Sequence, residues 1–328
     1  MQNKQEINSF STPQLVRFEI TAQCSLGCSH CYISENTRKI NDMDLQHVKD
    51  VIDRLASIPH IKILFLGGEP LERKDIIEIV KHAKSRGVYA GIDTNASLLT
   101  PELAKALKHA GLDKLNVTIY GTTSKTHDAF TKPGHFRKII NALALAKAEG
   151  INTDLAFLLT RKNFLELFRV EGFAKKYSAK DVHLDVFMSL GGIKQQESFQ
   201  LNVMQFALFW GIIRPVFSKL NLLGHGSLSD SGIKVSLCER RTVPLIKPDG
   251  EVWPCLFYPY SIGNILKFEP SDIWARLSCF AYDKNICRKC VESKLANPLK
   301  KASASSRGFS SFIMELHGFY NGVMRLFN

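Results

Sequence analysis

Three of the eight cysteines in this 328-residue chain lie close together, at Cys24, Cys28 and Cys31. Their C-x3-C-x2-C spacing lets three thiolates on one loop point at a single centre. Thiolates are soft ligands that select iron–sulfur clusters, zinc or copper(I). A structural zinc site and a complete cubane each take four protein ligands, so three cysteines leave one position open to another ligand. The alternative is a zinc site that borrows a histidine such as His30, which lies between two of these cysteines.

Four further cysteines form a second set in the C-terminal part, at Cys238, Cys255, Cys287 and Cys290. A hairpin-like stretch with a Pro-Asp-Gly turn separates the first two, and the last two form C-x2-C. Four thiolates close a site, either as tetrahedral zinc or as a cubane. The eighth cysteine, Cys279, is interpreted as a buried small hydrophobe, with ligation or hydrogen-atom donation as alternatives.

The elements that must position the first set are short β-rich runs that alternate with amphipathic stretches. The runs are dense in Val, Ile, Leu and Phe, which is typical of strands buried on both faces; they cover residues 15–21, 61–67, 88–94, 114–120, 152–160 and 181–189. Six such βα units predict an α/β fold with a parallel sheet and right-handed crossovers, as an open barrel or a doubly wound sheet. In either arrangement, ligands gather at the carboxyl ends of the strands.

The βα pattern stops at Gly191-Gly192. From the second cysteine set onward the sequence shows short strand-like runs and turn residues instead. We therefore predict a core over residues 15–190, a connecting helical segment over 191–237, a cysteine-rich domain over 238–292, and a basic linker with an amphipathic helix over 293–328. That last helix carries apolar residues on one face. It is expected to dock onto the body, with a partner protein or a membrane surface as the alternatives.

Composition excludes several classes of protein. Apolar residues make up 45% of the chain, too many for a disordered protein, and the length is too great for a disulfide-stapled miniprotein. No apolar run is long enough to span a membrane, and the N-terminus lacks a signal core, so a cytoplasmic location is expected. The 43 Lys and Arg against 31 Asp and Glu give a net charge of +12. Solvated lysines on helix faces explain such a charge, and it also suits an acidic partner.

A second motif follows the second predicted strand, at Gly67-Gly68-Glu69-Pro70. Taken alone it is a strand-ending turn. Together with C-x3-C-x2-C and the aromatic Tyr32, it resembles the radical S-adenosylmethionine (AdoMet) superfamily. The resemblance implies a partial (β/α)6 barrel and a [4Fe–4S] cluster held by Cys24, Cys28 and Cys31, whose open iron chelates AdoMet. AdoMet is then cleaved to a 5′-deoxyadenosyl radical that abstracts a hydrogen atom from the substrate.

Other AdoMet contacts are expected from the same resemblance. The paired glycines let backbone approach a ligand, Glu69 accepts from the AdoMet ammonium, and Tyr32 lies against the adenine. Further candidates at the strand ends are Thr94, Asn95, Thr118 and Asn163, which otherwise serve as caps and turns. Peptide-modifying relatives often carry Asp-Gly and later an arginine after the fourth strand. This chain has Tyr120-Gly121 and Lys132 instead, so those roles cannot be carried over.

The C-terminal cysteines resemble the SPASM and twitch domains that are appended to radical AdoMet enzymes. The shared landmarks are Gly250, Pro254-Cys255, Gly263-Asn264-Ile265, Ile273-Trp274 and Cys287. A full SPASM domain has seven cysteines, so the four present here imply the reduced twitch form with one auxiliary [4Fe–4S] cluster. Four protein ligands favour a role for that cluster in electron transfer.

The resemblance implies an oxidoreductase-type enzyme that oxidises or crosslinks a ribosomally made peptide. The alternative is a radical dehydrogenase or cofactor-biosynthesis enzyme acting on a small molecule; a non-catalytic zinc or nucleic-acid-binding module is disfavoured. Expected partners are an electron donor such as flavodoxin or ferredoxin and a separate leader-peptide-binding protein, because only about fourteen residues precede the first predicted strand.

Overall fold

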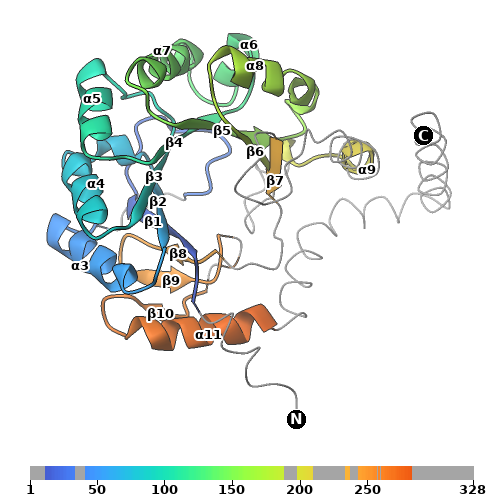
Figure 1. Ribbon diagram of the computed structural model, residues 1–328. Coiled ribbons are helices and arrows are strands. Elements are labelled where there is room, and N and C mark those ends of the chain that lie inside the picture. Colours follow the sequence, from blue (N-terminus) through green and yellow to red (C-terminus); the bar gives the residue numbers. More distant parts are fainter. Residues whose placement is uncertain are drawn as a thin grey trace, which may run out of the picture.

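The structure is a computed structural model, and it describes residues 12–33, 41–187, 198–209, 233–236, 243–256, 258 and 260–282. Its strands form one ten-stranded sheet in the order β10-β9-β8-β1-β2-β3-β4-β5-β6-β7. Strands β1 to β7 run parallel to their neighbours in chain order. Figure 1 shows these strands along a curved wall with the helices outside it, which is the layout of an open barrel.

The predicted strands agree closely with those of the structure. The central six are β1 (Leu15–Thr21), β2 (Lys62–Gly67), β3 (Tyr89–Thr94), β4 (Lys114–Ile119), β5 (Thr153–Leu159) and β6 (Val182–Val186). The covering helices are α3 (Leu45–Ala56), α4 (Ile76–Ser85), α5 (Pro101–His109), α6 (Ser124–Asp128), α7 (His135–Ala148) and α8 (Val170–Lys176). Short 3-10 turns follow two strands, at η1 (Pro70–Glu72) and η2 (Phe164–Phe168), and α9 spans Val203–Leu208.

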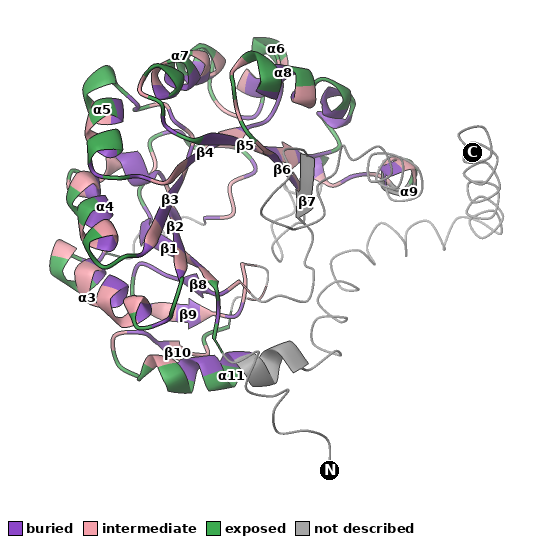
Figure 2. Ribbon diagram, in the orientation of Figure 1, coloured by how far each residue is buried: buried purple, intermediate pink, exposed green. Residues whose placement is uncertain are grey.

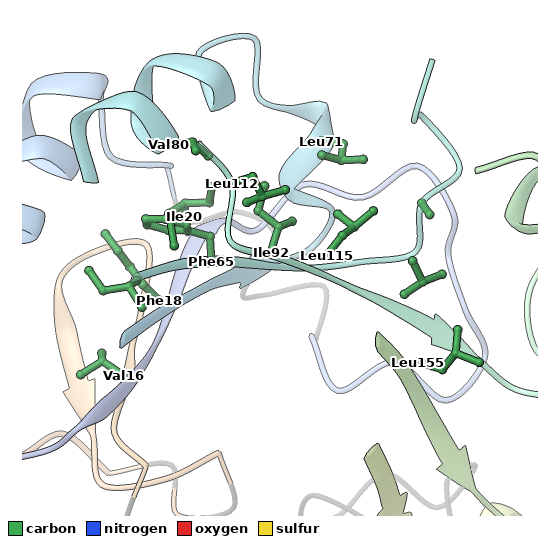
Figure 3. Close-up of a cluster of buried hydrophobic side chains, with 14 of the residues drawn as sticks. Val16, Phe18, Ile20, Phe65, Leu71, Val80, Ile92, Leu112, Leu115 and Leu155 are labelled. Atoms are coloured by element: carbon green, nitrogen blue, oxygen red, sulfur yellow. The ribbon is translucent and has the colours of Figure 1, made fainter. Parts of the chain in front are cut away.

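The helix-facing side of the sheet is the hydrophobic core. Alternate residues of each strand point to it, because side chains alternate across a strand. In β1 these are Val16, Phe18 and Ile20, all without solvent exposure. Figure 3 shows them packed with Phe65 and Ile92 from the neighbouring strands. Figure 2 shows the helices buried where they face the strands and exposed on their outer sides.

The concave side of the sheet carries polar residues among apolar ones such as Leu64 and Leu158. The strands are thus largely buried on both faces, as expected, but only the helix-facing side is consistently apolar. The residues between the core positions include Arg17 and Glu19 of β1, Asp93 of β3, Asn116 of β4 and Asp154 of β5. Their strands retain enough apolar residues to form the core on one face alone. The concave wall therefore presents charged and amide groups below the strand ends where the cysteine loop lies.

The C-terminal strands continue this sheet. They are β7 (Ile233–Ser236), β8 (Leu245–Ile246), β9 (Glu251–Trp253) and β10 (Gly263–Asn264), followed by helix α11 (Pro270–Tyr282). Strand β8 pairs in parallel with β1, and β9 pairs antiparallel with β8 across the predicted turn. Gly250 in that turn has φ +85°, a conformation that favours glycine. The sheet thus runs across the boundary expected between the core and the cysteine-rich domain.

Candidate functional site

The cysteine loop begins where β1 ends, and Asp42 holds its first residues. Thr21 Oγ1 donates to Asp42 Oδ2 at 2.5 Å, and the Ala22 N–H donates to Oδ1 of the same carboxylate at 2.8 Å. Further along, the Ser25 N–H donates to Glu72 Oε1 at 2.6 Å. These bonds attach the loop to its neighbours on both sides and fix where the first cysteine lies.

The paired glycines allow the end of β2 to touch the backbone that carries the cysteines. A Cβ on Gly67 would lie 2.0 Å from the Thr21 carbonyl oxygen, and one on Gly68 would lie 1.9 Å from that of Gln23. The same approach lets Gly68 N–H donate to the Thr21 oxygen at 2.8 Å and Glu69 N–H to the Gln23 oxygen at 2.7 Å. The close approach that the sequence analysis expected toward a ligand is therefore made toward the protein's own loop.

The three cysteines are half-buried and lie near enough for their charges to interact. Burial, followed by the neighbouring Cys31 and Cys24 thiolates, raises the pKa of Cys28 to about 12. A polar hydrogen points at one of the sulfurs, because Asn95 Nδ2 lies 3.8 Å from Cys24 Sγ. Three soft donors whose negative charges would repel one another, with an amide directed at one of them, suit a positively charged iron–sulfur core.

His30 does not join the cysteines as a fourth ligand in this arrangement. It is 6% exposed, and its ring packs edge-on against Tyr120, Phe130 and Phe199 at centroid distances of 4.4, 5.7 and 5.8 Å. Burial lowers its pKa to about 4, so the ring is neutral. The geometry thus places His30 in an aromatic cluster behind the loop, which weakens the zinc alternative.

Tyr32 connects the loop to the C-terminal strands. Its hydroxyl donates to Glu19 Oε1 at 2.9 Å, and the Lys247 ammonium, just after β8, donates to the other oxygen of Glu19. Lys247 also lies over the Trp253 ring, 4.7 Å from its centroid. The described contacts of Tyr32 are therefore with protein, and its expected contact with adenine stays a prediction.

Glu69 is fully buried and accepts three hydrogen bonds from protein groups. Leu71 N–H and Thr94 Oγ1 donate to Oε1 at 3.0 and 2.5 Å, and Asn95 N–H donates to Oε2 at 2.8 Å. Burial raises the pKa of Glu69 to about 7. A carboxylate has about four acceptor positions, so one remains for an ammonium donor. The side chain also joins the ends of β2 and β3 beside Cys24.

Two other residues expected to contact AdoMet, Asn163 and Thr118, differ in how much of the side chain is available to a ligand. The Asn163 amide donates to the carbonyls of Tyr120 and Leu158 at 2.9 and 2.8 Å, and its oxygen accepts twice from Thr160, at 2.7 and 2.9 Å. These four bonds use its full capacity, so a ligand contact requires one of them to break. Thr118 lies partly exposed on the concave side of β4.

Sequence reasoning missed the polar residues of the concave wall. Asn116 Nδ2 donates to Asp93 Oδ1 at 2.5 Å, and burial raises the pKa of Asp93. Asp154 Oδ2 accepts from the Lys114 ammonium at 2.5 Å and lies 2.9 Å from His183 Nε2. The sequence does carry a signal for them, a polar residue at every second position of β4 and β6, but the apolar density of these runs is the stronger pattern.

The second cysteine set is only partly described. Cys255 is half-buried, and its backbone pairs with that of Tyr258 in an isolated antiparallel β-bridge just beyond β9. The expected partners Cys238, Cys287 and Cys290 lie outside the described residues, as does the segment 293–328 with its amphipathic helix; the side chain of Cys279 is likewise not described. The four-thiolate site therefore stays a prediction.

Within the described ranges, no three His, Cys, Asp or Glu side chains converge on a point where one metal ion would fit. No described helix has the length and apolar character needed to cross a membrane.

Comparison with known protein families gives two matches that follow the order of the two cysteine sets. The model of the radical SAM superfamily matches residues 18–169, and that of SPASM, an iron–sulfur cluster-binding domain, matches residues 238–291. Together they cover more than half of the chain.

Two relatives that match most of the chain share about a quarter of their residues with it. The AdoMet-dependent heme synthase of Methanosarcina barkeri is 26% identical over 294 residues, covering 82% of this chain and 84% of that protein. The mycofactocin maturase MftC of Mycobacterium tuberculosis is 27% identical over 289 residues, covering 82% of this chain and 72% of that protein.

Solved structures share the fold at low identity. Native anSMEcpe with bound AdoMet has a TM-score of 0.68 and 19% identity, covering 86% of this chain and 88% of that one. Streptococcus suis SuiB bound to precursor peptide SuiA has a TM-score of 0.67 and 13% identity, covering 82% of this chain and 66% of that one. These likenesses concern the fold, and they agree with the α/β partial barrel described above.

Proposed function

Because the chain belongs to the radical SAM superfamily and carries a C-terminal SPASM domain, we propose that it abstracts a hydrogen atom from its substrate with a radical derived from AdoMet. Its cofactors are AdoMet and [4Fe–4S] clusters. Bound together, they supply the 5′-deoxyadenosyl radical. The observation that carries the proposal is the loop after β1, which groups the thiols of Cys24, Cys28 and Cys31 beside the Gly67-Gly68-Glu69 turn.

Each part of the site has a task in this proposal. Cys24, Cys28 and Cys31 hold the first cluster, and Asn95 Nδ2 donates toward the Cys24 sulfur. Glu69 offers its remaining acceptor position to the AdoMet ammonium while it holds Thr94 and Asn95 in place. Gly67, Gly68, Tyr32, Thr118 and Asn163 line or brace the same strand ends. Burial of Glu69 keeps water from competing for that position.

The auxiliary cluster belongs to the C-terminal cysteines. We assign Cys238, Cys255, Cys287 and Cys290 as its ligands, on the basis of the SPASM match over residues 238–291. Four protein ligands would suit such a cluster to electron transfer, the chemistry that a net oxidation of the substrate requires. An external donor such as flavodoxin or ferredoxin supplies the electron for AdoMet cleavage.

The substrate we favour is a ribosomally made peptide, which the enzyme oxidises or crosslinks. The net charge of +12 suits an acidic leader segment, with or without a separate leader-binding protein. The similarity to MftC, a maturase, and to SuiB, solved with its precursor peptide, supports this choice. The second candidate is a small molecule, and the similarity to a heme synthase over 84% of that protein's length favours an acidic tetrapyrrole.

The cysteine assignment is tested by anaerobic reconstitution of the full chain. The unmodified protein is expected to hold about eight irons, as two cubanes require, and to form 5′-deoxyadenosine. Changing Cys24, Cys28 and Cys31 together to Ala should leave about four irons and abolish 5′-deoxyadenosine. The matched control is Cys279→Ala, a cysteine outside both sets, which should retain both. Continued 5′-deoxyadenosine formation by the triple variant would refute the site.

The auxiliary assignment needs a separate variant. Cys255→Ala should lower the iron content to about four and suppress substrate oxidation, while 5′-deoxyadenosine still forms without coupling to product. The substrate class is read from the same reaction by mass spectrometry. A loss of hydrogen from an acidic-leader peptide encoded beside this gene supports peptide maturation, and conversion of a tetrapyrrole instead supports the second candidate.

A further inference from the structure

Asn116 is a buried amide on the concave side of the sheet, and the function proposed above does not use it. It lies in β4 between Leu115 and Val117, which belong to the hydrophobic core on the helix-facing side. Because side chains alternate across a strand, Asn116 faces the concave side, where it is only 6% exposed. Thr118, an expected AdoMet contact, is two residues further along the same face. Asn116 therefore lies close to the proposed AdoMet site.

The side chain of Asn116 is held at one end only. Its Nδ2 donates to Oδ1 of Asp93 at 2.5 Å, and Asp93 is its cross-strand neighbour on β3. The carboxylate orients the amide, because an amide oxygen in the same place would face a negatively charged acceptor. Asn116 Oδ1 is therefore turned away from Asp93, and this buried atom has no hydrogen-bond partner in the part of the chain that the structure describes.

Other buried polar groups on the concave side satisfy one another. Asp154 Oδ2 accepts from the Lys114 ammonium at 2.5 Å, and Glu19 accepts from the Lys247 ammonium. Buried polar groups without a partner are rare in folded proteins, and a ligand that is absent from the structure is one explanation for them. The open oxygen of Asn116 is thus an exception on this side of the sheet that calls for a partner.

Arg17 provides an open donor on the same side. It alternates with core residues in β1, and its buried Nε has no hydrogen-bond partner among the described residues. The strand register places Arg17 level with Gly91 of β3, two residues before Asp93. An open acceptor and an open donor on one face match a peptide, whose backbone amides carry both an N–H and a carbonyl. A tetrapyrrole carboxylate only accepts, and it would meet the negative charge of Asp93.

We propose that Asn116 Oδ1 accepts a hydrogen bond from a backbone N–H of a peptide substrate and so positions the peptide on the concave side of the sheet. Arg17 Nε donates to a carbonyl of the same peptide. The inference rests on the proposed function and deepens it, because it names an amide as the group that is recognised. It favours the peptide over the tetrapyrrole candidate.

The test measures the steady-state kinetics of the reconstituted full chain with AdoMet and the peptide encoded beside this gene. Asn116→Leu keeps the size of the side chain and removes the acceptor. We expect KM for the peptide to rise about tenfold with kcat nearly unchanged, because a contact made equally in the ground state and the transition state is lost. Asn152→Leu is the matched control, because Asn152 is an exposed asparagine just before β5, and it should keep the original KM. An unchanged KM in Asn116→Leu overturns the inference, and a bound water would then account for the open oxygen.

A second experiment changes the peptide instead of the protein, so it also serves where Asn116→Leu fails to fold. Each backbone amide around the modified residue is methylated on nitrogen in turn, which removes one N–H at a time. We expect one position to raise KM of the unmodified chain about tenfold and to have no further effect in Asn116→Leu. The inference is wrong if no position raises KM, or if the two penalties simply add.

Failure of the proposed function looks different, because the unmodified chain would then form no 5′-deoxyadenosine. A chain that forms 5′-deoxyadenosine but leaves the peptide unchanged overturns this inference and the choice of a peptide, while the radical chemistry stands.

Discussion

Because Gly68 has no side chain, the end of β2 can touch the backbone that carries the cysteines. Gly68→Ala would place a Cβ 1.9 Å from the Gln23 carbonyl oxygen, which is backbone and cannot swing aside. We expect the loop to shift and the N-terminal cluster to assemble poorly, so that iron falls from about eight toward about four per chain. Iron analysis after reconstitution measures this.

A matched control for that substitution lies in α8. Gly172 has no atom within 4 Å of the position of an added Cβ. Gly172→Ala should therefore keep the full iron content and stabilise the helix by up to about 1 kcal/mol. Equal iron content in the two alanine variants would show that the glycine contact does not position the cysteine loop.

Glu69 makes the stability of the cofactor-free protein depend on pH. Its pKa is about 7 in the fold against an ordinary 4.5, so between those values the folded chain holds a proton that the unfolded chain has lost. Its contribution to stability is therefore complete below about pH 4.5 and falls as pH rises to about 7, by roughly 3 kcal/mol in all. Urea unfolding of Glu69→Gln from pH 5 to 8 should show a shallower decline than the unmodified chain. Glu78→Gln, on the exposed face of α4, should keep the original slope.

The sequence identifies these residues by type but not by partner. The cysteine spacing and Gly67-Gly68-Glu69 were enough to predict the family and its cofactors, and the family models confirm both. The sequence did not show that the Asn163 amide is fully used in hydrogen bonds to its own turn and to the end of β4. Such contacts depend on which strands are neighbours and how their side chains point, and no local spacing records that.

At the scale of elements, β8 is attached to β1 by a buried ion pair between Lys247 and Glu19. Lys247 is 4% exposed and Glu19 is not exposed at all. Removing one partner of a buried pair leaves an uncompensated group and typically costs about 3–5 kcal/mol. Lys247→Met should therefore lower the unfolding free energy by about that amount, as measured by urea denaturation.

The double variant Glu19→Gln/Lys247→Met tests whether that loss belongs to the pair. It removes both charges, so it should recover part of the stability that Lys247→Met loses. The exposed i,i+4 pair of Lys175 with Glu171 provides the comparison, and Lys175→Met should cost only a few tenths of a kcal/mol. A Lys247→Met cost as small as that would contradict a structural role for the buried pair.

The elements that the sequence predicted well are those with a long periodic signal. The six central strands and helices α3, α4, α5 and α7 span enough residues for their apolar pattern to appear. Strand β8 has two residues and β7 has four, which is too short for any period. The pairing of β8 with β1 joins residues more than two hundred positions apart, so it could not be predicted from local pattern.

At the scale of the whole molecule, one sheet joins the radical SAM core to the start of the SPASM region. Strand β8 covers the edge of β1, the strand from which the cysteine loop leaves, and the Arg17 N–H donates to the Pro244 carbonyl at 2.9 Å. An uncovered β1 would present unpaired backbone groups, which favours edge-to-edge association. The C-terminal strands therefore support the strand from which the loop with Cys24, Cys28 and Cys31 leaves, and Cys255 follows just after β9.

Two truncations separate these roles. A chain ending at residue 237 loses β8 to β10, exposes the edge of β1 and leaves Glu19 without Lys247. We expect it to aggregate, to melt at a lower temperature and to reconstitute the N-terminal cluster poorly, as followed by size-exclusion chromatography, thermal unfolding and iron content. A chain ending at residue 292 keeps the strands and both cysteine sets, so it should stay monodisperse and hold as much iron as the full chain. The shorter chain could instead stay monodisperse, with an unchanged melting temperature and four irons. That result would show that pairing with β8 does not stabilise β1 and that the continuous sheet adds nothing to the stability of the core.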